Sequence, residues 1–352
     1  MERVYFFDGI RGWAALIVLL GHTFNMFPQI PVFHQFYFRV VVDAALAVYV
    51  FFVLSGASLS YSIIKNYDEL KIKKAIVKRI PRLSIPIFFV TFCTYIIMKL
   101  SLMYNYDAGV ITGSAWLSSF YDFEEKFSNI FTFSIYKVFF YFAQPVYNAS
   151  LWTMPHELYG SFFVFIFLLV FKKDILWLPV MGVAAYYLNR FNPILLCFAG
   201  GIFISYLLVH FDDFLQSSKI QVLLFVTFCL VVYFLIKDKK MNGLSQHARC
   251  IYAFLFCFIF IFFGKFREFF ELRVSKFFGK ISFVLYLVHL PIMCSLSSFL
   301  IVSLPPNIYI YIYIALITVF FSIAVARLFV VIDEKSLDIS NKLANCLLDD
   351  KD

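Results

Sequence analysis

Long apolar runs separated by short polar breaks dominate the chain. A helix needs roughly 20 mainly apolar residues to cross a hydrocarbon core of about 30 Å, and most of these runs are close to that length. The strict alternation of apolar and polar positions that marks barrel strands is absent. The pattern predicts an all-α polytopic integral membrane protein with about ten transmembrane helices, near residues 10–27, 40–62, 84–104, 157–172, 175–189, 192–210, 220–236, 249–264, 281–302 and 308–332. The fourth to sixth runs are crowded, so nine or eleven spans stay open.

Lysine and arginine collect in two of the polar breaks, 65–83 and 265–280. Short loops rich in these residues stay on the cytoplasmic side, which predicts that both termini are cytoplasmic and that segment 105–156 lies outside. The break at 237–249 is also basic and contradicts this assignment. The aromatic stretch 126–151 predicts a re-entrant or interfacial helix that covers the site.

Composition narrows the class of protein further. The chain is 62% hydrophobic and 15% charged, which excludes a soluble domain. The net charge of +8 reflects basic cytoplasmic loops, so we expect no nucleic-acid partner. Seven scattered cysteines, an odd number without a CxxC pair, imply neither a disulfide framework nor a metal site.

The first apolar run carries Arg11 and His22, eleven positions apart. That spacing is about three helical turns, or roughly 16 Å, so both side chains share one face. Ionisable residues inside a span are costly and mark a functional site by default. His22 is predicted to accept a proton or carry an acyl group, and the alternative is a core histidine bonded to a neighbouring helix. Asp43, in the second span, needs a charged partner and is predicted to orient His22.

Further candidates lie near other span ends. Ser55 and Gly56 open a run of small residues that lets a helix or a ligand approach closely. Arg79 and Arg82 are predicted to share one side of a first helical turn, where guanidinium pairs suit phosphate, although lipid head groups would explain them too.

The outer segment ends in Trp152 and Glu157, a pair that can bind a sugar by stacking and hydrogen bonding. Interfacial tryptophans are common, so Trp152 alone carries little information. Tyr286 and His289 belong to the ninth run, and His289 is intramembrane and followed by Pro291. His289 could face the same cavity as His22.

Taken together, these residues resemble the membrane acyltransferase 3 family, whose members O-acylate surface polysaccharides, peptidoglycan and some small molecules. The resemblance spans most of the chain in six ordered blocks: Asp8 to Gly12 with His22; Phe51 to Gly56; Arg79 and Arg82; Leu151, Trp152 and Glu157; Ser282, Tyr286 and His289; Glu334 and Lys335. The arginine and histidine of the first block are separated by ten residues, as in the family. Ala57, Pro155, His156 and Ser336 depart from the family pattern, and none of these departures touches a candidate catalytic residue.

The resemblance implies a membrane acyltransferase domain over residues 1–335 and a short cytoplasmic tail over 336–352. It further implies an acyl-CoA donor, acetyl-CoA first, with phosphates near Arg79 and Arg82 and with Arg11 supporting the donor. His22 would act as general base or as nucleophile, while Glu157 would orient the acceptor. No bound cofactor is expected, and the partners are membrane lipids and a glycan acceptor, free or lipid-linked.

Two other classes of function stay open. A transporter or flippase of lipid-linked saccharides also has a polytopic fold with charges and prolines at mid-membrane depth, although no internal repeat is visible. A scaffold or receptor function would account for the high apolar content of the chain but not for the position of Arg11 and His22 on one helix face. An acyltransferase could also use a lipid or small molecule as acceptor. The expected location is the bacterial inner membrane; the acyl group and the oligomeric state are not determined by the sequence.

Overall fold

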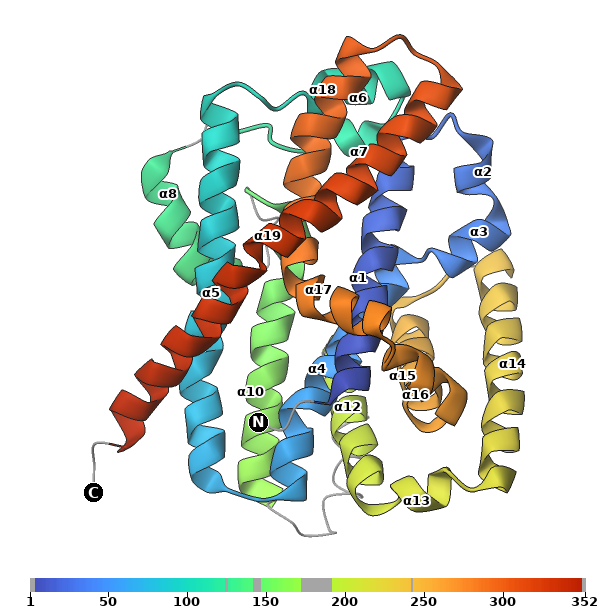
Figure 1. The fold of residues 1–352 in the computed structure, drawn as a ribbon, viewed down its shortest axis with the longest axis vertical. Coiled ribbons are helices and arrows are strands. Elements are labelled where there is room, and N and C mark those ends of the chain that lie inside the picture. Colours follow the sequence, from blue (N-terminus) through green and yellow to red (C-terminus); the bar gives the residue numbers. More distant parts are fainter. Residues whose placement is uncertain (1–3, 124–125, 142–146, 172–191, 242, 350–352) are drawn as a thin grey trace.

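The structure is a computed structural model that describes residues 4–123, 126–141, 147–171, 192–241 and 243–349. Every regular element in these ranges is a helix (Figure 1). The long helices are α1 (Tyr5–Asn25), α4 (Ala44–Lys65), α5 (Glu69–Lys99), α10 (Met154–Phe171), α12 (Pro193–His210), α14 (Ser218–Met241), α15 (Gln246–Phe262), α17 (Arg273–Ile292) and α19 (Ile308–Asp349).

Shorter helices connect and cover the long ones. They are α2 (Pro31–His34), α3 (Phe36–Val41), α6 (Asn105–Thr112), α7 (Ala115–Ser118), α8 (Phe127–Thr132), α9 (Val138–Phe140), α13 (Asp212–Leu215), α16 (Gly264–Phe270), α18 (Ser298–Ser303), the π-helices η1 (Phe133–Lys137) and η3 (Met293–Ser297), and the 3-10 helix η2 (Ala149–Thr153). The segment predicted as one interfacial helix at 126–151 is thus a series of short helices in its described parts. Phe127 and Phe131 of α8 pack against Phe92 and Phe88 of α5.

Seven helical stretches of the described chain are long and apolar enough to cross a membrane, or eight if α15 and α16, bent by 89°, form one broken span. The seven are Phe36–Lys65, Glu69–Lys99, Ala149–Phe171, Pro193–His210, Ser218–Met241, Arg273–Ser303 and Ile308–Leu348. The predicted fold class, an all-α polytopic membrane protein, is confirmed. The run predicted at 175–189 lies outside the described residues. Helix α1 is not among the seven, because Asp8, Arg11 and His22 lower its hydropathy.

Two predicted boundaries are wrong, and in both cases a helix runs on beyond its apolar part. Helix α5 begins at Glu69, after Asp68 accepts a hydrogen bond from the Lys71 amide, so most of the basic segment 65–83 is helical rather than a loop. Arg79 and Arg82 therefore lie in the middle of a helix and not in its first turn. Helix α19 has 42 residues and measures roughly 63 Å, so it extends well past a bilayer core and includes most of the predicted tail.

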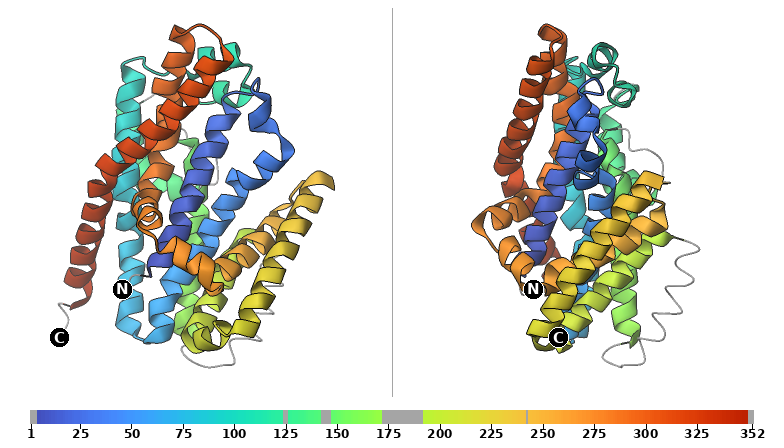
Figure 2. Two further views of the ribbon diagram at one scale, coloured as in Figure 1. Left: turned by 45° about the vertical axis from the view of Figure 1, so that its right-hand side comes forward. Right: turned by 90° about the vertical axis from the view of Figure 1, so that its right-hand side faces the viewer.

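Helix α1 lies between α17 and α4, with α19 on one side of the molecule and α14 on the other (Figure 2, left). Glycines allow this close packing. A Cβ atom on Gly12 would lie 2.4 Å from the Gly279 nitrogen of α17, and one on Gly56 of α4 would lie 2.4 Å from the Phe198 carbonyl oxygen of α12. Small residues at such crossings let helix backbones touch inside a membrane. The α1–α17 crossing thereby brings the chemistry of these two helices together.

The two ends of the molecule differ in what they carry. We call the lower end the one that holds the α4–α5 connection and the last turns of α19, and the upper end the one that holds α6, α7 and α18 (Figure 1). Arg11 lies nearer the lower end of α1, and His22 lies nearer the upper end.

Candidate active site

A cavity of about 560 Å³ lies among α1, α4, α5, α10, α17 and α19. Its lining includes Phe51 to Tyr61 on one side of α4, Lys78 of α5, Asn341 in the C-terminal part of α19 and the buried Tyr286 of α17. Its charged lining residues are Asp8, Arg11, Lys78, Arg79, Arg82, Glu157, Lys280, Asp333 and Glu334. Lys280 and Glu334 are exposed and pair with each other, whereas Arg79, Glu157 and Asp333 are largely buried. Buried charges in an apolar bundle are costly, and by default they mark a candidate functional site.

Arg11 is held in this cavity by neutral groups. Its guanidinium donates to the Leu54 carbonyl at 3.1 Å and to the Ser58 hydroxyl at 2.7 Å, both on α4. Among the described residues, no carboxylate forms an ion pair with Arg11 or with Lys78. The positive charge of both side chains is therefore available to an anionic ligand.

Arg79 instead forms an ion pair with Glu157 of α10. Both side chains are largely buried, with 13% and 14% exposure. The Arg79 Nε atom is buried and has no hydrogen-bond partner among the described residues. The pair therefore joins α5 to α10 and leaves one buried N–H group to be satisfied by a ligand.

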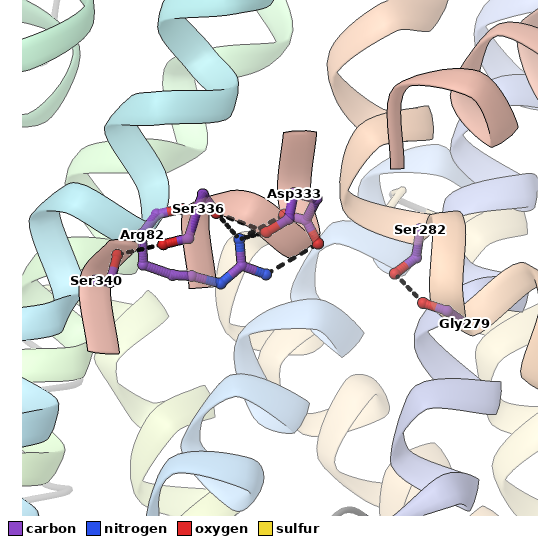
Figure 3. A network of polar contacts seen from close by, with 6 residues as sticks. All are labelled: Arg82, Gly279, Ser282, Asp333, Ser336 and Ser340. Atoms are coloured by element: carbon purple, nitrogen blue, oxygen red, sulfur yellow. Dashed lines mark hydrogen bonds and ion pairs between the residues drawn. The ribbon is translucent and has the colours of Figure 1, made fainter. Parts of the chain in front are cut away.

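Arg82 binds the helix that closes the other side of the cavity (Figure 3). Its guanidinium donates to Asp333 Oδ2 at 3.0 Å and to the Ser336 hydroxyl at 2.6 Å, both on α19. Bidentate arginine–carboxylate pairs are strong and directional. Arg82 therefore fixes α19 against α5 as well as contributing to the cavity lining.

Two histidines meet above the inner end of the cavity. His22 Nδ1 lies 2.9 Å from His289 Nε2, and the rings stack with centroids 5.1 Å apart. His289 is buried with 1% exposure, whereas His22 is partly exposed. The histidines predicted from two distant apolar runs therefore form one pair, which we call the histidine pair.

Tyr286 separates the cavity from the histidine pair. Its ring lines the cavity and lies 5.9 Å from the His289 ring, centroid to centroid. Its hydroxyl donates to the Ser150 carbonyl and lies 3.1 Å from the Thr153 hydroxyl. Tyr286 therefore contacts both the cavity and the histidine pair.

The segment that contains α6 and α7, which we call the upper segment, contributes Trp116 of α7 to the site. The Trp116 ring lies 5.2 Å from that of His22. Asn105 orders this segment by donating to the carbonyls of Leu117 and Phe120 at 3.2 and 2.7 Å. Nearby, Tyr121 has a left-handed φ of 60° and a buried hydroxyl without a partner among the described residues. Burial raises the pKa of Tyr121 well above its ordinary value, so the hydroxyl stays protonated and can donate to a ligand.

The structure contradicts one predicted contact. Asp43 does not contact His22: its carboxylate caps α4 through the Leu46 amide at 2.9 Å and pairs with Lys239 at 2.5 Å. One lysine of the basic break at 237–249 is thus paired with a carboxylate of another helix end. Glu157 lines the cavity and pairs with Arg79, and its role in orienting the acceptor stays a prediction.

Trp152 is 40% exposed and packs against His156 without lining the cavity. Ser55 does line it, while Gly56 serves the α4–α12 crossing.

Sequence reasoning missed several residues of the site. Asp333 and Ser336 bind Arg82, and Trp116 and Ser150 contact the histidine pair. The departure from the family pattern at Ser336 was a usable signal, because a serine there keeps α19 helical and supplies a hydroxyl. Nothing in the sequence around Trp116 distinguishes it from the other interfacial aromatic residues.

An all-α membrane protein with an ionic cavity and an adjacent histidine pair is equipped to bind an anionic substrate and to transfer a proton or a group. The family model described as "Acyltransferase domain" matches residues 4–327, nearly the whole chain. The protein therefore belongs to the membrane acyltransferase 3 family and is a membrane acyltransferase. No curated protein and no solved structure matches the chain.

Proposed function

We propose that this protein is an O-acyltransferase that moves an acyl group, acetyl in the first instance, from cytoplasmic acyl-CoA to a hydroxyl of a surface glycan such as O-antigen, capsule or exopolysaccharide. The observation that carries the proposal is the placement of one cavity with available positive charges below Tyr286 and of the histidine pair directly beyond it.

The donor end of the proposal rests on the cavity. Acyl-CoA carries several phosphate charges and a long arm that ends in the thioester. Lys78, toward the lower end, and Arg11, deeper in, offer charges that no carboxylate of the described chain neutralises. Arg79 keeps an unpartnered Nε–H for an oxygen of the arm. Arg79 and Arg82 were both expected to hold phosphates; in this proposal Arg82 mainly shapes the site through α19.

We place the proposed acceptor site in the upper segment. Trp116 presents an aromatic ring beside His22, and aromatic rings can stack on sugar faces. In this proposal Trp116, rather than the candidate Trp152, stacks on the sugar. A free or lipid-linked glycan would then approach His22 from the side opposite to the donor.

The chemistry follows from this arrangement. With His22 as general base, the acceptor hydroxyl oxygen attacks the thioester carbonyl while its proton passes to His22, and the protonated histidine then returns the proton to the departing CoA sulfur. The second route is an acyl-imidazole on His22 that relays the group between the two faces. Both routes need one unprotonated ring nitrogen on His22.

The lysines at the lower end of α5 support a cytoplasmic placement of that end, by the rule that basic residues stay inside. The expected location is accordingly the bacterial inner membrane. Helix α19 ends and α1 begins toward this same end (Figure 1).

Mass spectrometry of surface glycans from the host tests the proposal. Cells with the intact gene, a deletion, His22→Ala or His210→Ala are compared at equal protein level, and His210 lies at the exposed end of α12. Acetylated units heavier by about 42 Da are expected with the intact protein and His210→Ala alone. Identical spectra in all four strains would overturn glycan acylation and favour a lipid or small-molecule acceptor, or a flippase.

A further inference from the structure

The hydrogen bonds around the histidine pair determine where its protons lie. His289 Nδ1 lies 3.1 Å from the carbonyl oxygen of Leu285, one turn earlier in α17. A carbonyl oxygen can only accept, so His289 Nδ1 must carry the proton. A neutral imidazole has one N–H, which leaves His289 Nε2 as an acceptor.

The same assignment of donors and acceptors extends to His22. Its Nδ1 lies 2.9 Å from the His289 Nε2 acceptor and must therefore donate. Because neutral His22 then has its single proton on Nδ1, its Nε2 keeps the lone pair. We infer that His289 is a positioning residue that holds His22 in the tautomer with a basic Nε2, through the chain Leu285 carbonyl, His289 and His22. This inference rests on the proposed function for its catalytic meaning.

The opposite proton arrangement is unfavourable in this geometry. If His289 carried its proton on Nε2, its bare Nδ1 would face the Leu285 carbonyl, and two acceptors would lie 3.1 Å apart. A buried polar atom left without a donor costs more than an average hydrogen bond contributes. In the described chain, no carboxylate is hydrogen-bonded to either ring, so no acidic residue competes for these protons.

Neighbouring residues hold His289 in place. The Ser150 hydroxyl lies 3.4 Å from His289 Nε2 as a second, weaker donor. Asn148 joins this loop to α17, because its amide donates to the Leu287 carbonyl at 2.7 Å while its oxygen accepts from the Ser150 amide at 3.0 Å. His289 is thus fixed on a rigid frame, and the partly exposed His22 is the member of the pair that a substrate can reach.

Two substitutions distinguish the effect of losing the hydrogen-bond acceptor at position 289 from the effect of changing the volume of the side chain. Glutamine in His289→Gln keeps an acceptor oxygen, whereas leucine in His289→Leu fills space without one. His210→Leu, at the exposed end of α12, is the matched control. The first readout is the nitrogen-15 NMR spectrum of labelled histidines in lipid bilayers, with the His22 signals identified by their loss in His22→Ala.

We expect His22 in the unaltered protein and in His289→Gln to show a protonated Nδ1 and a bare Nε2, and in His289→Leu to show a mixture of tautomers. For acyl transfer, His289→Leu should lower kcat by about 10²-fold or more with KM for acyl-CoA within about twofold, and His289→Gln should recover most of that loss. A protonated Nε2 on His22 in the unaltered protein would overturn the inference, as would an unchanged kcat in His289→Leu.

The spectrum needs no substrate, so the two proposals can fail separately. The expected tautomer in a protein that transfers no acyl group would support the inference and overturn the proposed function. Active transfer with the other tautomer would do the reverse.

Discussion

The cavity and the histidine pair are adjacent, but ion pairs hold the cavity together and uncharged contacts hold the histidine pair. In the cavity, Arg79 and Arg82 bind carboxylates on α10 and α19, so ion pairs hold the surrounding helices in place. In the histidine pair, the contacts are between neutral rings, a backbone carbonyl and a hydroxyl. Charge in the first region serves binding and helix positions, while the second holds a nitrogen base by uncharged contacts. Substitutions should therefore affect substrate affinity and stability in the cavity, and turnover in the histidine pair.

The largest effect on activity is expected from His22→Ala. Removing a general base lowers turnover by about 10²–10⁴-fold, and the variant should unfold at nearly the same temperature, because His22 is only partly buried. Release of labelled acyl groups from acyl-CoA measures the rate, and His210→Ala is the control. A His22→Ala protein that keeps more than half of the rate would remove this residue from the chemistry.

Arg82→Ala should have the next largest effect, on stability as well as on activity. The substitution leaves the Asp333 carboxylate without its partner. Removing one partner of a completely buried ion pair costs about 3–5 kcal/mol of stability. Because these side chains are 12–22% exposed, we expect a loss of about 1–3 kcal/mol. The double variant Arg82→Ala/Asp333→Ala should regain part of this loss. Asp333→Ala completes the cycle, and thermal unfolding in detergent gives all three values. A loss in the double variant equal to the sum of the two single losses would show that the two side chains are not coupled.

Lys78→Ala tests binding without disturbing the ion pairs. Lys78 lines the cavity and is half-buried, so losing one available charge should raise KM for acyl-CoA about fivefold and leave kcat unchanged. Lys74→Ala, one turn earlier in α5 and outside the cavity lining, should leave both unchanged. Equal effects of the two substitutions would mean that a diffuse basic surface, and not the cavity, attracts the donor.

The smallest effect on activity is expected from Asp43→Asn. Asparagine caps a helix as well as aspartate does, so only the ion pair with Lys239 is lost; these side chains are 13% and 16% exposed, so the loss should cost about 1–3 kcal/mol of stability and leave activity unchanged. Steady-state transfer and the unfolding midpoint measure both. A tenfold fall in kcat with unchanged stability would restore the orienting role that the sequence predicted for Asp43.

The apolar runs were sufficient to predict the membrane class, because the thickness of a bilayer limits helix length directly. They could not show where α5 begins or where α19 ends, since both helices run on into polar sequence beyond the membrane. Helix α1 carries the polar face of the site and for that reason lacks the hydropathy of a typical span.

The site was predictable residue by residue but not as a set of contacts. Arg11 and His22 share a helix, so their relation followed from helical geometry. His289 is 267 positions from His22, and only the close crossing of α1 and α17 at Gly12 and Gly279 brings the two histidines together. The error over Asp43 has the same origin, because its partner Lys239 comes from a distant helix that local sequence does not reveal.

The most direct test of the account uses the purified protein in lipid nanodiscs with acetyl-CoA labelled in the acetyl group and a glycan fraction from the host. Free CoA and labelled glycan should form together at equal rates with the unaltered protein, and both should stop in His22→Ala while Lys74→Ala remains active. Thioester cleavage that continues unchanged in His22→Ala would contradict the central claim that the histidine pair, reached from the charged cavity, performs the transfer.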